Sequence, residues 1–416
     1  MAVASLLGRA GEARLVFAAD WLAVAAAVSL PWSTTASGVF FALLALALLS
    51  RLDASALRRE LATPAGGLPV LLALLGALGM AWADVSWTER WAGATSFFKL
   101  MLIPLLFAHF RCSARGVWVL AGYLASCVAL LVLSSLIHDP AKFDAVLVKN
   151  AATQSGEFVT CIFGLLPFAR ESLARRQWWR VAGIAAVVLG MLANMIYVAT
   201  GRTALVVALV LLMLFAARQL GGRGRAALFG GVAAIAAAAW FSSPYLRERT
   251  TELWTGYEAY EEANALTSSG QRMVFYRNSL MFIREAPLFG HGTGSIGALF
   301  DAAARGKTGS EGSRSNNPHN QTFAVAIQVG LVGAAVLWLM WIAHLVLFRG
   351  AGRLEWIGLV LVVQNLVGSL FNSHLFDFVQ GWVYVLGVGV VGGMVLGQRR
   401  TAPDEADSRS GPLGAA

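Results

Sequence analysis

The sequence is poor in charged residues and in cysteine. Only 13% of its 416 residues are Asp, Glu, Lys or Arg, about half of the share found in average globular proteins. Such a chain cannot cover the surface of a soluble enzyme with charge, and it is too apolar for a disordered adaptor. Three cysteines do not make a secreted disulfide scaffold. Hydrophobic residues instead make up 57% of the chain, and its mean hydropathy is +0.65.

The hydrophobic residues lie in runs of membrane-spanning length. Backbone polar groups in lipid must be satisfied within the protein, so such runs cross a membrane as α-helices. We therefore expect an all-α, polytopic membrane protein with about 12 transmembrane helices and a large external loop that contains helices. The predicted spans lie near residues 15–31, 36–50, 67–84, 93–110, 116–137, 153–169, 181–199, 203–217, 226–241, 320–348, 354–372 and 379–397.

The net charge of +9 is typical either of a nucleic-acid-binding protein or of an oriented membrane protein. With a cytoplasmic N-terminus, most basic residues fall in cytoplasmic segments, whereas the opposite short loops carry only Arg90, Lys142, Lys149 and Arg202. Positive residues stay on the cytoplasmic side, so this asymmetry predicts that both termini are cytoplasmic. The charge then reports topology, and nucleic acid is not an expected partner.

The predicted spans divide the chain into four segments. Residues 1–241 hold the first nine spans, residues 242–319 form the external loop, residues 320–398 hold the last three spans, and residues 399–416 form a cytoplasmic tail. The tail is polar and rich in Gly, Pro and Ser, so we expect it to be disordered. The first apolar run continues to Pro31, which favours an uncleaved helix over a signal peptide.

The cysteines, Cys112, Cys127 and Cys161, lie in or beside different spans. Their spacing matches neither a metal site nor a disulfide framework, and the sequence has no Asp-rich metal motif. We expect three ordinary buried residues, no metal and no cofactor.

The external loop is long enough to be functional. Residues 271–285 favour a helix that stops before Pro287 and can lie along the membrane interface. On such a helix Arg277 and Arg284 share a face, whereas Arg272 diverges from Arg277 by about 140°. The shared face suits lipid phosphates or is simply solvated, and Arg272 points toward the bundle. The glycine-rich run that follows, FGHGTGSIG, would let the backbone turn tightly or approach a ligand.

Ionisable groups at membrane depth are costly unless they pair or face water, so each is a candidate functional residue. Arg202 interrupts a long apolar stretch, which predicts two helices that meet in a tight turn at residues 200–202. Its planar guanidinium suits an anion there, although an interfacial anchor would look the same. Lys99 is a further candidate. His374 and Asp377 fall on a short external turn, where they can orient one another or a substrate hydroxyl, but turn polarity explains them equally well.

His319 lies immediately before a long apolar helix, in the sequence NNPHNQTF. Pro318 disfavours helix at the residue before it, and the nearby asparagines, Asn320 among them, can cap the helix that follows. A histidine at the mouth of the bundle has an ordinary pKa of about 6.5, which suits a general base. The simpler alternative is a surface histidine within a helix cap.

His319, Asn320, nine residues, Gly330, two residues and Gly333 resemble the H[NSQ]-x9-G-x-x-G signature of the O-antigen ligase family. The long external loop is also similar to theirs, with an arginine before the glycine-rich PLFGHGTGS run. The wider superfamily, which includes O-antigen polymerases and bacterial protein O-glycosyltransferases, shares much of this signature.

The resemblance implies an inner-membrane enzyme that transfers O-antigen glycan from undecaprenyl pyrophosphate to the lipid A-core oligosaccharide on the periplasmic face. Carried over, the family's essential histidine is His319, its loop arginine is Arg272, and the arginine between two middle spans is Arg202. Where relatives often have Leu four positions after that arginine, this chain has Leu205 and Val206. The external loop would then be periplasmic.

The chemistry of the residues agrees with this role. A diphosphate is a good leaving group, so the enzyme must mainly stabilise developing negative charge, for which Arg202 and Arg272 are suitable. His319 would deprotonate the acceptor hydroxyl. We expect a metal-independent transfer with inversion by a monomer that contacts membrane lipids. The expected substrate-binding residues are Arg277, Arg284, Asn320, Lys99, His374 and Asp377.

Two alternatives remain at this level. An O-antigen polymerase would use the same donor with a lipid-linked glycan as acceptor. A flippase for lipid-linked oligosaccharides should place its charges along a central path, whereas these charges gather at the external ends and in one loop.

Overall fold

The computed structural model describes residues 2–137 and 149–409. Helices form all of the regular structure in these ranges, and no strand occurs in them. The elements in chain order are α1 (Ala2–Ser29), α2 (Thr34–Leu49), α3 (Ala54–Leu61), α4 (Pro64–Leu78), η1 (Gly79–Ala81), α5 (Trp87–Phe98), η2 (Lys99–Met101), α6 (Leu102–Phe110), α7 (Gly116–Ile137), α8 (Ala151–Ala174), α9 (Trp178–Tyr197), α10 (Arg202–Gln219), α11 (Gly222–Ser242), α12 (Pro244–Ala263), α13 (Ser268–Glu285), α14 (Ile296–Ala304), η3 (Gly309–Gly312), α15 (Gln321–Leu347), α16 (Arg353–Gly368) and α17 (Phe378–Arg409).

The predicted hydrophobic runs all coincide largely with helices. By length and composition, eight helical stretches of the described chain can cross a membrane, or nine if the bent pair α2 and α3 is one span. Helices α2 and α16 have 16 residues each, which is short for a span. The fold is thus that of a multi-pass, all-helical membrane protein, and the count of about twelve spans stays a prediction.

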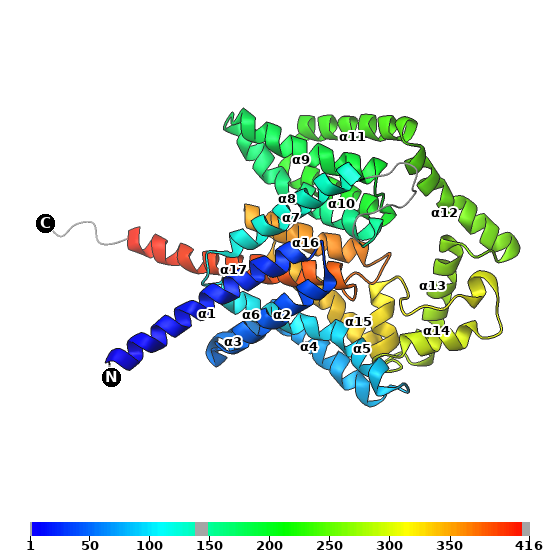
Figure 1. Cartoon of the computed structure of the whole chain (residues 1–416), viewed down its shortest axis with the longest axis horizontal. Helices are drawn as coiled ribbons and strands as arrows, with labels where there is room; N and C mark the ends of the chain where they lie inside the picture. Colours follow the sequence, from blue (N-terminus) through cyan, green and yellow to red (C-terminus); the bar gives the residue numbers. More distant parts are fainter. Residues whose placement is uncertain (1, 138–148, 410–416) are drawn as a thin grey trace.

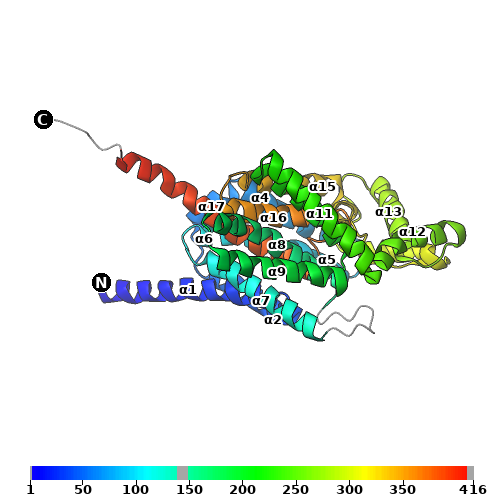
Figure 2. The ribbon, with the colours of Figure 1, turned by 90° about the horizontal axis from the view of Figure 1, so that it is seen from above.

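The helices of the bundle run along the long axis of the molecule (Figures 1 and 2). The start of α1 and the end of α17 project from one end, and α12, α13 and α14 gather at the opposite end. The polar segment between α11 and α15 therefore forms a separate cap on the end remote from the termini. Candidate residues on α13 and before α15 belong to this cap.

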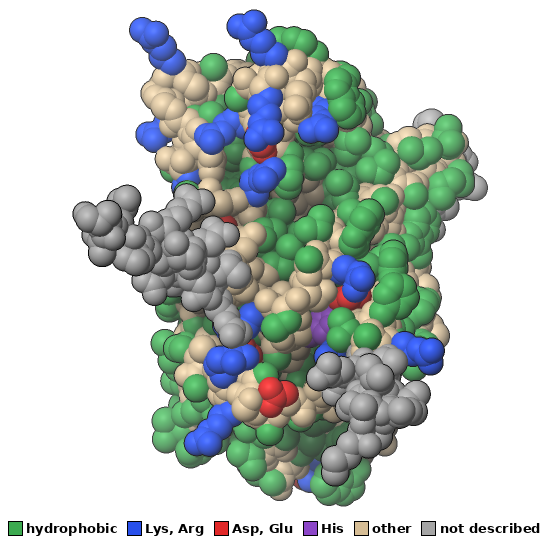
Figure 3. All heavy atoms as spheres, turned by 90° about the vertical axis from the view of Figure 1, so that its left-hand side faces the viewer, with side chains coloured by type: hydrophobic (Ala, Val, Ile, Leu, Met, Phe, Trp, Pro, Cys, Tyr) green, Lys and Arg blue, Asp and Glu red, His purple; other side chains and the backbone are tan. Residues whose placement is uncertain are grey.

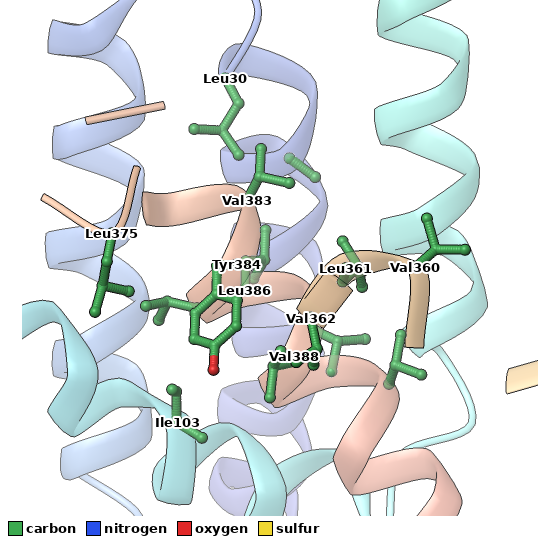
Figure 4. Close-up of a cluster of buried hydrophobic side chains, with 14 of the residues drawn as sticks. Leu30, Ile103, Val360, Leu361, Val362, Leu375, Val383, Tyr384, Leu386 and Val388 are labelled. Carbon is green, nitrogen blue, oxygen red and sulfur yellow. The ribbon is translucent and has the colours of Figure 1, made fainter. Parts of the chain in front are cut away.

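Helix α17 lies at the centre of the core, packed against α6 and α16. Its glycines allow this close approach: a Cβ on Gly389 would meet Leu106, and one on Gly392 would meet Phe107. Labelled side chains of α6, α16 and α17 meet in Figure 4, with Tyr384 among them. A core of small and β-branched residues gives the outer helices a rigid support.

Several local predictions agree with the structure. The long apolar stretch that Arg202 interrupts breaks between Tyr197 and Arg202, where α9 ends and α10 begins. The helix predicted at residues 271–285 is α13, and it ends at Glu285, two residues before Pro287. Cys127 and Cys161 are buried, but the prediction for Cys112 was wrong, since this residue is exposed in the turn after α6.

The predicted tail begins inside a helix. Helix α17 continues beyond the core to Arg409, so the tail residues up to that point are helical, and residues 410–416 lie outside the described residues. The external Lys142 also falls in a segment outside them.

Candidate active site

Helix α13 is the main element of the candidate site. It begins at the N-cap Thr267, whose side chain accepts a hydrogen bond from the backbone N–H of Gly270. Its apolar face is buried: Phe275 and Phe282 both pack edge-on against Phe300 of α14. The helix also packs against α15. One face of α13 is thus packed against other helices. This packing determines the direction in which the polar side chains of α13 point.

Arg272 lies on α13 and is half-buried. In the described part of the chain it makes no hydrogen bond and no ion pair, and its charge acts on His319 and Tyr276. The sequence placed this residue toward the bundle, away from Arg277, and the structure agrees. A guanidinium without a carboxylate partner among these residues can offer its donors to an anion.

His319 is held in the turn that precedes α15. Its backbone is left-handed, with φ of 55°, and its N–H donates to Asn317 Oδ1 at 2.8 Å. The imidazole stacks on Phe275 of α13, with ring centroids 5.8 Å apart. Tyr276, also on α13, donates its hydroxyl to the carbonyl of His319 at 3.1 Å. The ring of His319 is thus fixed against the helix that carries Arg272.

Burial lowers the pKa of His319 below its ordinary value, and the positive charge of Arg272 lowers it further. A hydrogen bond with Asn372 acts in the opposite direction. The imidazole is therefore neutral near pH 7, which is the protonation state that a general base needs.

Arg202 is the first residue of α10, and it reaches the start of α13. Its Nη2 donates to Ser268 Oγ at 3.1 Å. Ser268 and Arg272 are four residues apart on α13, so they lie on one face of the helix. The tertiary structure thus gathers Arg202, Arg272 and His319 around the first two turns of α13.

Arg277 and Arg284 have different surroundings, although they share a face. Arg277 Nη2 donates to Glu311 Oε1 at 2.6 Å, and Tyr260 donates to the same oxygen at 3.2 Å. The hydrogen bond from Arg277 lowers the pKa of the Glu311 carboxyl. Arg277 is therefore bound to the η3 segment, whereas Arg284 is exposed. A substrate role for either residue stays a prediction.

The turn between α16 and α17 lies beside His319. Asn372 Oδ1 accepts hydrogen bonds from His319 Nδ1 at 3.1 Å and from Asn317 Nδ2 at 2.9 Å. Asn372 Nδ2 donates to Asp377 Oδ2 at 2.8 Å. Burial raises the pKa of Asp377 to about 6, and the charge of Lys99 opposes this rise. These contacts join two polar side chains of the turn, Asn372 and Asp377, to the candidate base.

Lys99 and His374 are two buried basic residues at this turn. The buried ammonium of Lys99 donates to the carbonyls of Phe376 at 3.3 Å and Asp377 at 3.1 Å. His374 is buried, and burial lowers its pKa to about 4. Among the described residues it makes no hydrogen bond with Asp377, which bonds to Asn372 instead. The expected mutual orientation of His374 and Asp377 is therefore absent from this structure.

Asn320 caps helix α15, as its sequence position predicted. Its Oδ1 accepts from the N–H of Phe323 at 3.2 Å, and its Nδ2 donates to the carbonyl of Leu370 at 3.2 Å. The residue thus ties the start of α15 to the turn that carries Asn372.

Sequence reasoning missed Asn372 and Tyr276. Asn372 stands in the FNSHLFDF motif, where only the ionisable residues attracted attention. A usable signal was present: an asparagine in a turn seldom lacks hydrogen-bond partners. Nothing local in the sequence distinguishes Tyr276 from other aromatic residues of α13.

The first of the two signature glycines, Gly330, lies at a break in α15. Val329 and Gly330 leave the helical conformation, and Gly330 has φ of 72°. The segment that follows α13 hydrogen-bonds there: His291 N–H donates to the carbonyl of Ile327 at 2.8 Å, and Leu331 N–H donates to that of Pro287 at 2.8 Å. The glycine-rich run therefore docks onto α15.

The glycines of this run let the backbone turn tightly, as one of the two sequence-based alternatives has it, and they approach protein backbone. A Cβ on Gly292 would lie 2.3 Å from Ala83 Cα, and one on Gly294 would lie 2.4 Å from the carbonyl oxygen of Glu89. Only glycine fits such close packing at positive φ. The run thus anchors the cap to α4, α5 and α15.

Residues 185–339 match the model of the O-antigen ligase family. The match extends from within α9 to within α15, and it includes Arg202, Arg272, His319 and the signature glycines. The chain therefore carries an O-antigen ligase domain, consistent with the O-antigen ligase/polymerase superfamily. This domain indicates a membrane enzyme of the ligase or polymerase type. No curated protein matches the chain.

Proposed function

We propose that this protein is an O-antigen ligase. It transfers O-antigen glycan from undecaprenyl pyrophosphate to the lipid A-core oligosaccharide on the periplasmic face of the inner membrane. The observation that carries the proposal is the meeting of Arg202, Arg272 and His319 around the start of α13, within the O-antigen ligase domain.

Each residue has a defined role in a single displacement. His319 removes the proton from the acceptor hydroxyl, whose oxygen bonds to the anomeric carbon of the donor sugar. The bond from that carbon to the diphosphate oxygen breaks, and the diphosphate leaves with the electron pair. Arg202 and Arg272 stabilise the charge that develops on it. Attack opposite the leaving group inverts the anomeric centre, and the reaction needs neither metal nor cofactor.

The charge pattern supports a periplasmic site. Arginines outnumber acidic residues on the face seen from the end with the termini (Figure 3). Positive residues stay in the cytoplasm, so this face is the cytoplasmic one. The cap of α12, α13 and α14, at the other end, then faces the periplasm, where the lipid-linked donor would reach it.

The products of a reconstituted reaction test the proposal. Purified protein with undecaprenyl pyrophosphate-linked glycan and lipid A-core should yield lipid A-core that carries the glycan. A longer lipid-linked glycan would identify the polymerase instead, and a translocated but unchanged donor would identify a flippase. Activity that a chelator abolishes and only a divalent ion restores would disprove metal independence.

His319→Ala tests the base. This variant should lose transfer by about 100-fold or more, because general-base catalysis contributes at least about this factor. Its expression and donor binding should be close to wild type. Near-normal transfer would remove His319 from the mechanism.

Arg202→Lys and Arg272→Lys should recover only part of the activity lost in the corresponding Ala variants, because an ammonium cannot form the two parallel bonds of a guanidinium. Transfer rates at saturating donor measure this difference.

A further inference from the structure

The hydrogen bond at Nδ1 of His319 determines which of its nitrogens is basic. A neutral imidazole has one N–H donor and one acceptor nitrogen. Asn372 Oδ1, 3.1 Å from Nδ1, can only accept. Nδ1 must therefore carry the hydrogen, and the lone pair stays on Nε2.

The orientation of the Asn372 amide is itself determined by its other partners. Its Nδ2 faces Asp377 Oδ2 at 2.8 Å, and a carboxylate can only accept. Its Oδ1 also accepts a hydrogen bond from Asn317 Nδ2 at 2.9 Å. A flipped amide would set its oxygen against the carboxylate and its NH2 group against that of Asn317. Both contacts would be repulsive, so a single orientation is stable.

Asn317 is fixed in the same way. Its Oδ1 accepts from Ser373 Oγ at 2.7 Å and from the backbone N–H of His319 at 2.8 Å. Its Nδ2 is then left for Asn372. The backbone of Asp377 is held in turn by Lys99. The amide orientations of Asn317 and Asn372 are thus set by partners other than the imidazole of His319.

We propose that Asn372 is a positioning residue that holds His319 in the Nδ1–H tautomer and so directs the basic Nε2 to the acceptor hydroxyl. This inference rests on the proposed function of His319 as the base. Among the side chains that the structure describes, and among the backbone groups of residues 2–137 and 149–409, none hydrogen-bonds to Nε2. Phe275, stacked on the ring, keeps the imidazole from swinging out of this position.

An asparagine suits this position better than a carboxylate. The charged groups that face His319 are Arg272, on α13, and Asp377, which lies behind Asn372 and beside Lys99. A carboxylate directly on Nδ1 would favour the imidazolium, which cannot take a proton. The amide oxygen of Asn372 accepts the same N–H bond without that charge. It also keeps the bond after Nε2 has taken the proton.

The tautomer can be observed without any transfer reaction. Full-length protein with ¹⁵N-labelled histidine, at pH 8 in lipid nanodiscs, should give a His319 signal pair with Nδ1 protonated and Nε2 unprotonated. Loss of that pair in His319→Gln identifies it. A wild-type protein with the hydrogen on Nε2 would overturn the proposal, whatever its activity.

Two substitutions of Asn372 then distinguish a role in positioning the imidazole of His319 from a purely structural role. Asn372→Leu, which cannot accept a hydrogen bond, should populate both tautomers and lower kcat by about 10–100-fold, with KM for the donor within about twofold. Asn372→Asp restores an acceptor at Nδ1 and should recover much of kcat. It should also move the acid limb of the pH profile to higher pH, because the new carboxylate raises the pKa of His319.

The matched control is Asn316→Leu, which changes an exposed asparagine in the segment that carries His319 and should leave kcat, KM and the tautomer as in wild type. Equal losses in Asn372→Leu and Asn372→Asp, or a change in KM alone, would contradict the positioning role. If Asn372→Leu does not fold, the wild-type tautomer and the pH profile of Asn372→Asp still decide. No transfer by a wild type with the expected tautomer would refute the proposed function and leave the tautomer assignment standing.

Discussion

At the scale of single residues, the candidate site places the guanidinium of Arg272 near His319, the proposed base. Burial and the charge of Arg272 both lower the pKa of His319. This reduces its intrinsic basicity, but it keeps the imidazole neutral and ready to accept a proton below pH 7. Arg272 would at the same time stabilise the leaving diphosphate. One guanidinium thus influences both ends of the proposed reaction.

Arg272→Gln should separate these two effects. Removal of the positive charge raises the pKa of His319. On acidification, the neutral imidazole is therefore protonated at a higher pH than in the wild type. The acid limb of the kcat profile should therefore move to higher pH, while its plateau falls because the diphosphate has lost a cation. The profile is measured from pH 5 to 9, with Arg305→Gln, an exposed arginine after α14, as control. A limb that moves to lower pH would contradict this assignment.

At the scale of elements, the break in α15 joins the cap to the bundle. At Val329 and Gly330 the helix gives up its own hydrogen bonds and accepts the segment after α13 in their place. Backbone bonds of this kind do not depend on side-chain identity, but they require close approach. This explains why glycines recur on both sides of the contact, at Gly290 and at Gly330.

Gly330→Ala should be strongly destabilising. The residue has φ of 72°, and a Cβ would lie 2.0 Å from the carbonyl oxygen of Leu288. Backbone strain alone costs about 1–3 kcal/mol, and displacement of the docked segment adds to it. The thermal unfolding temperature should fall clearly, together with activity. Gly183→Ala, at a helical glycine with open space around its Cα, should unfold at or slightly above the wild-type temperature. Similar unfolding temperatures for both variants would disprove the docking role.

At the scale of the whole molecule, the charge of the chain is divided between two ends. The face at the end of the termini is rich in arginine (Figure 3), whereas the opposite cap contains acidic residues that pair with basic ones, as Arg277 does with Glu311. The net charge of +9 is thus an average over two faces with different tasks. In the proposed orientation the basic face lies in the cytoplasm and the mixed cap carries the candidate site.

The orientation is open to a labelling test. In a Cys112→Ser background, Cys127 and Cys161 remain buried, so an introduced cysteine dominates the reaction with a membrane-impermeant maleimide. Arg305→Cys, in the cap, should react in intact spheroplasts. Arg223→Cys, at an exposed position in the first turn of α11, should react only after the membrane is permeabilised. The reverse pattern would place the candidate site in the cytoplasm.

Much of the helical architecture was accessible from the sequence because its causes are local. Long apolar runs must form helices in lipid, so the runs coincide with helices. The break between α9 and α10 and the end of α13 lie where Gly201 and Pro287 predicted them. The exposed position of Cys112 and the helical extension of α17 show the limit of such reasoning, since neither is determined by hydropathy alone.

The candidate site also has features that the sequence determines and features that only the tertiary structure determines. The sequence alone determined the chemical types involved, a histidine before a long helix and arginines outside the bundle, because ionisable groups are rare and conspicuous among long apolar runs. Only the tertiary structure decided which groups meet: Arg202 bonds to a serine on α13, and His319 bonds to Asn372, which lies beyond the next two helices. Such contacts depend on how helices distant in the chain pack together, and neither hydropathy nor residue spacing records that packing.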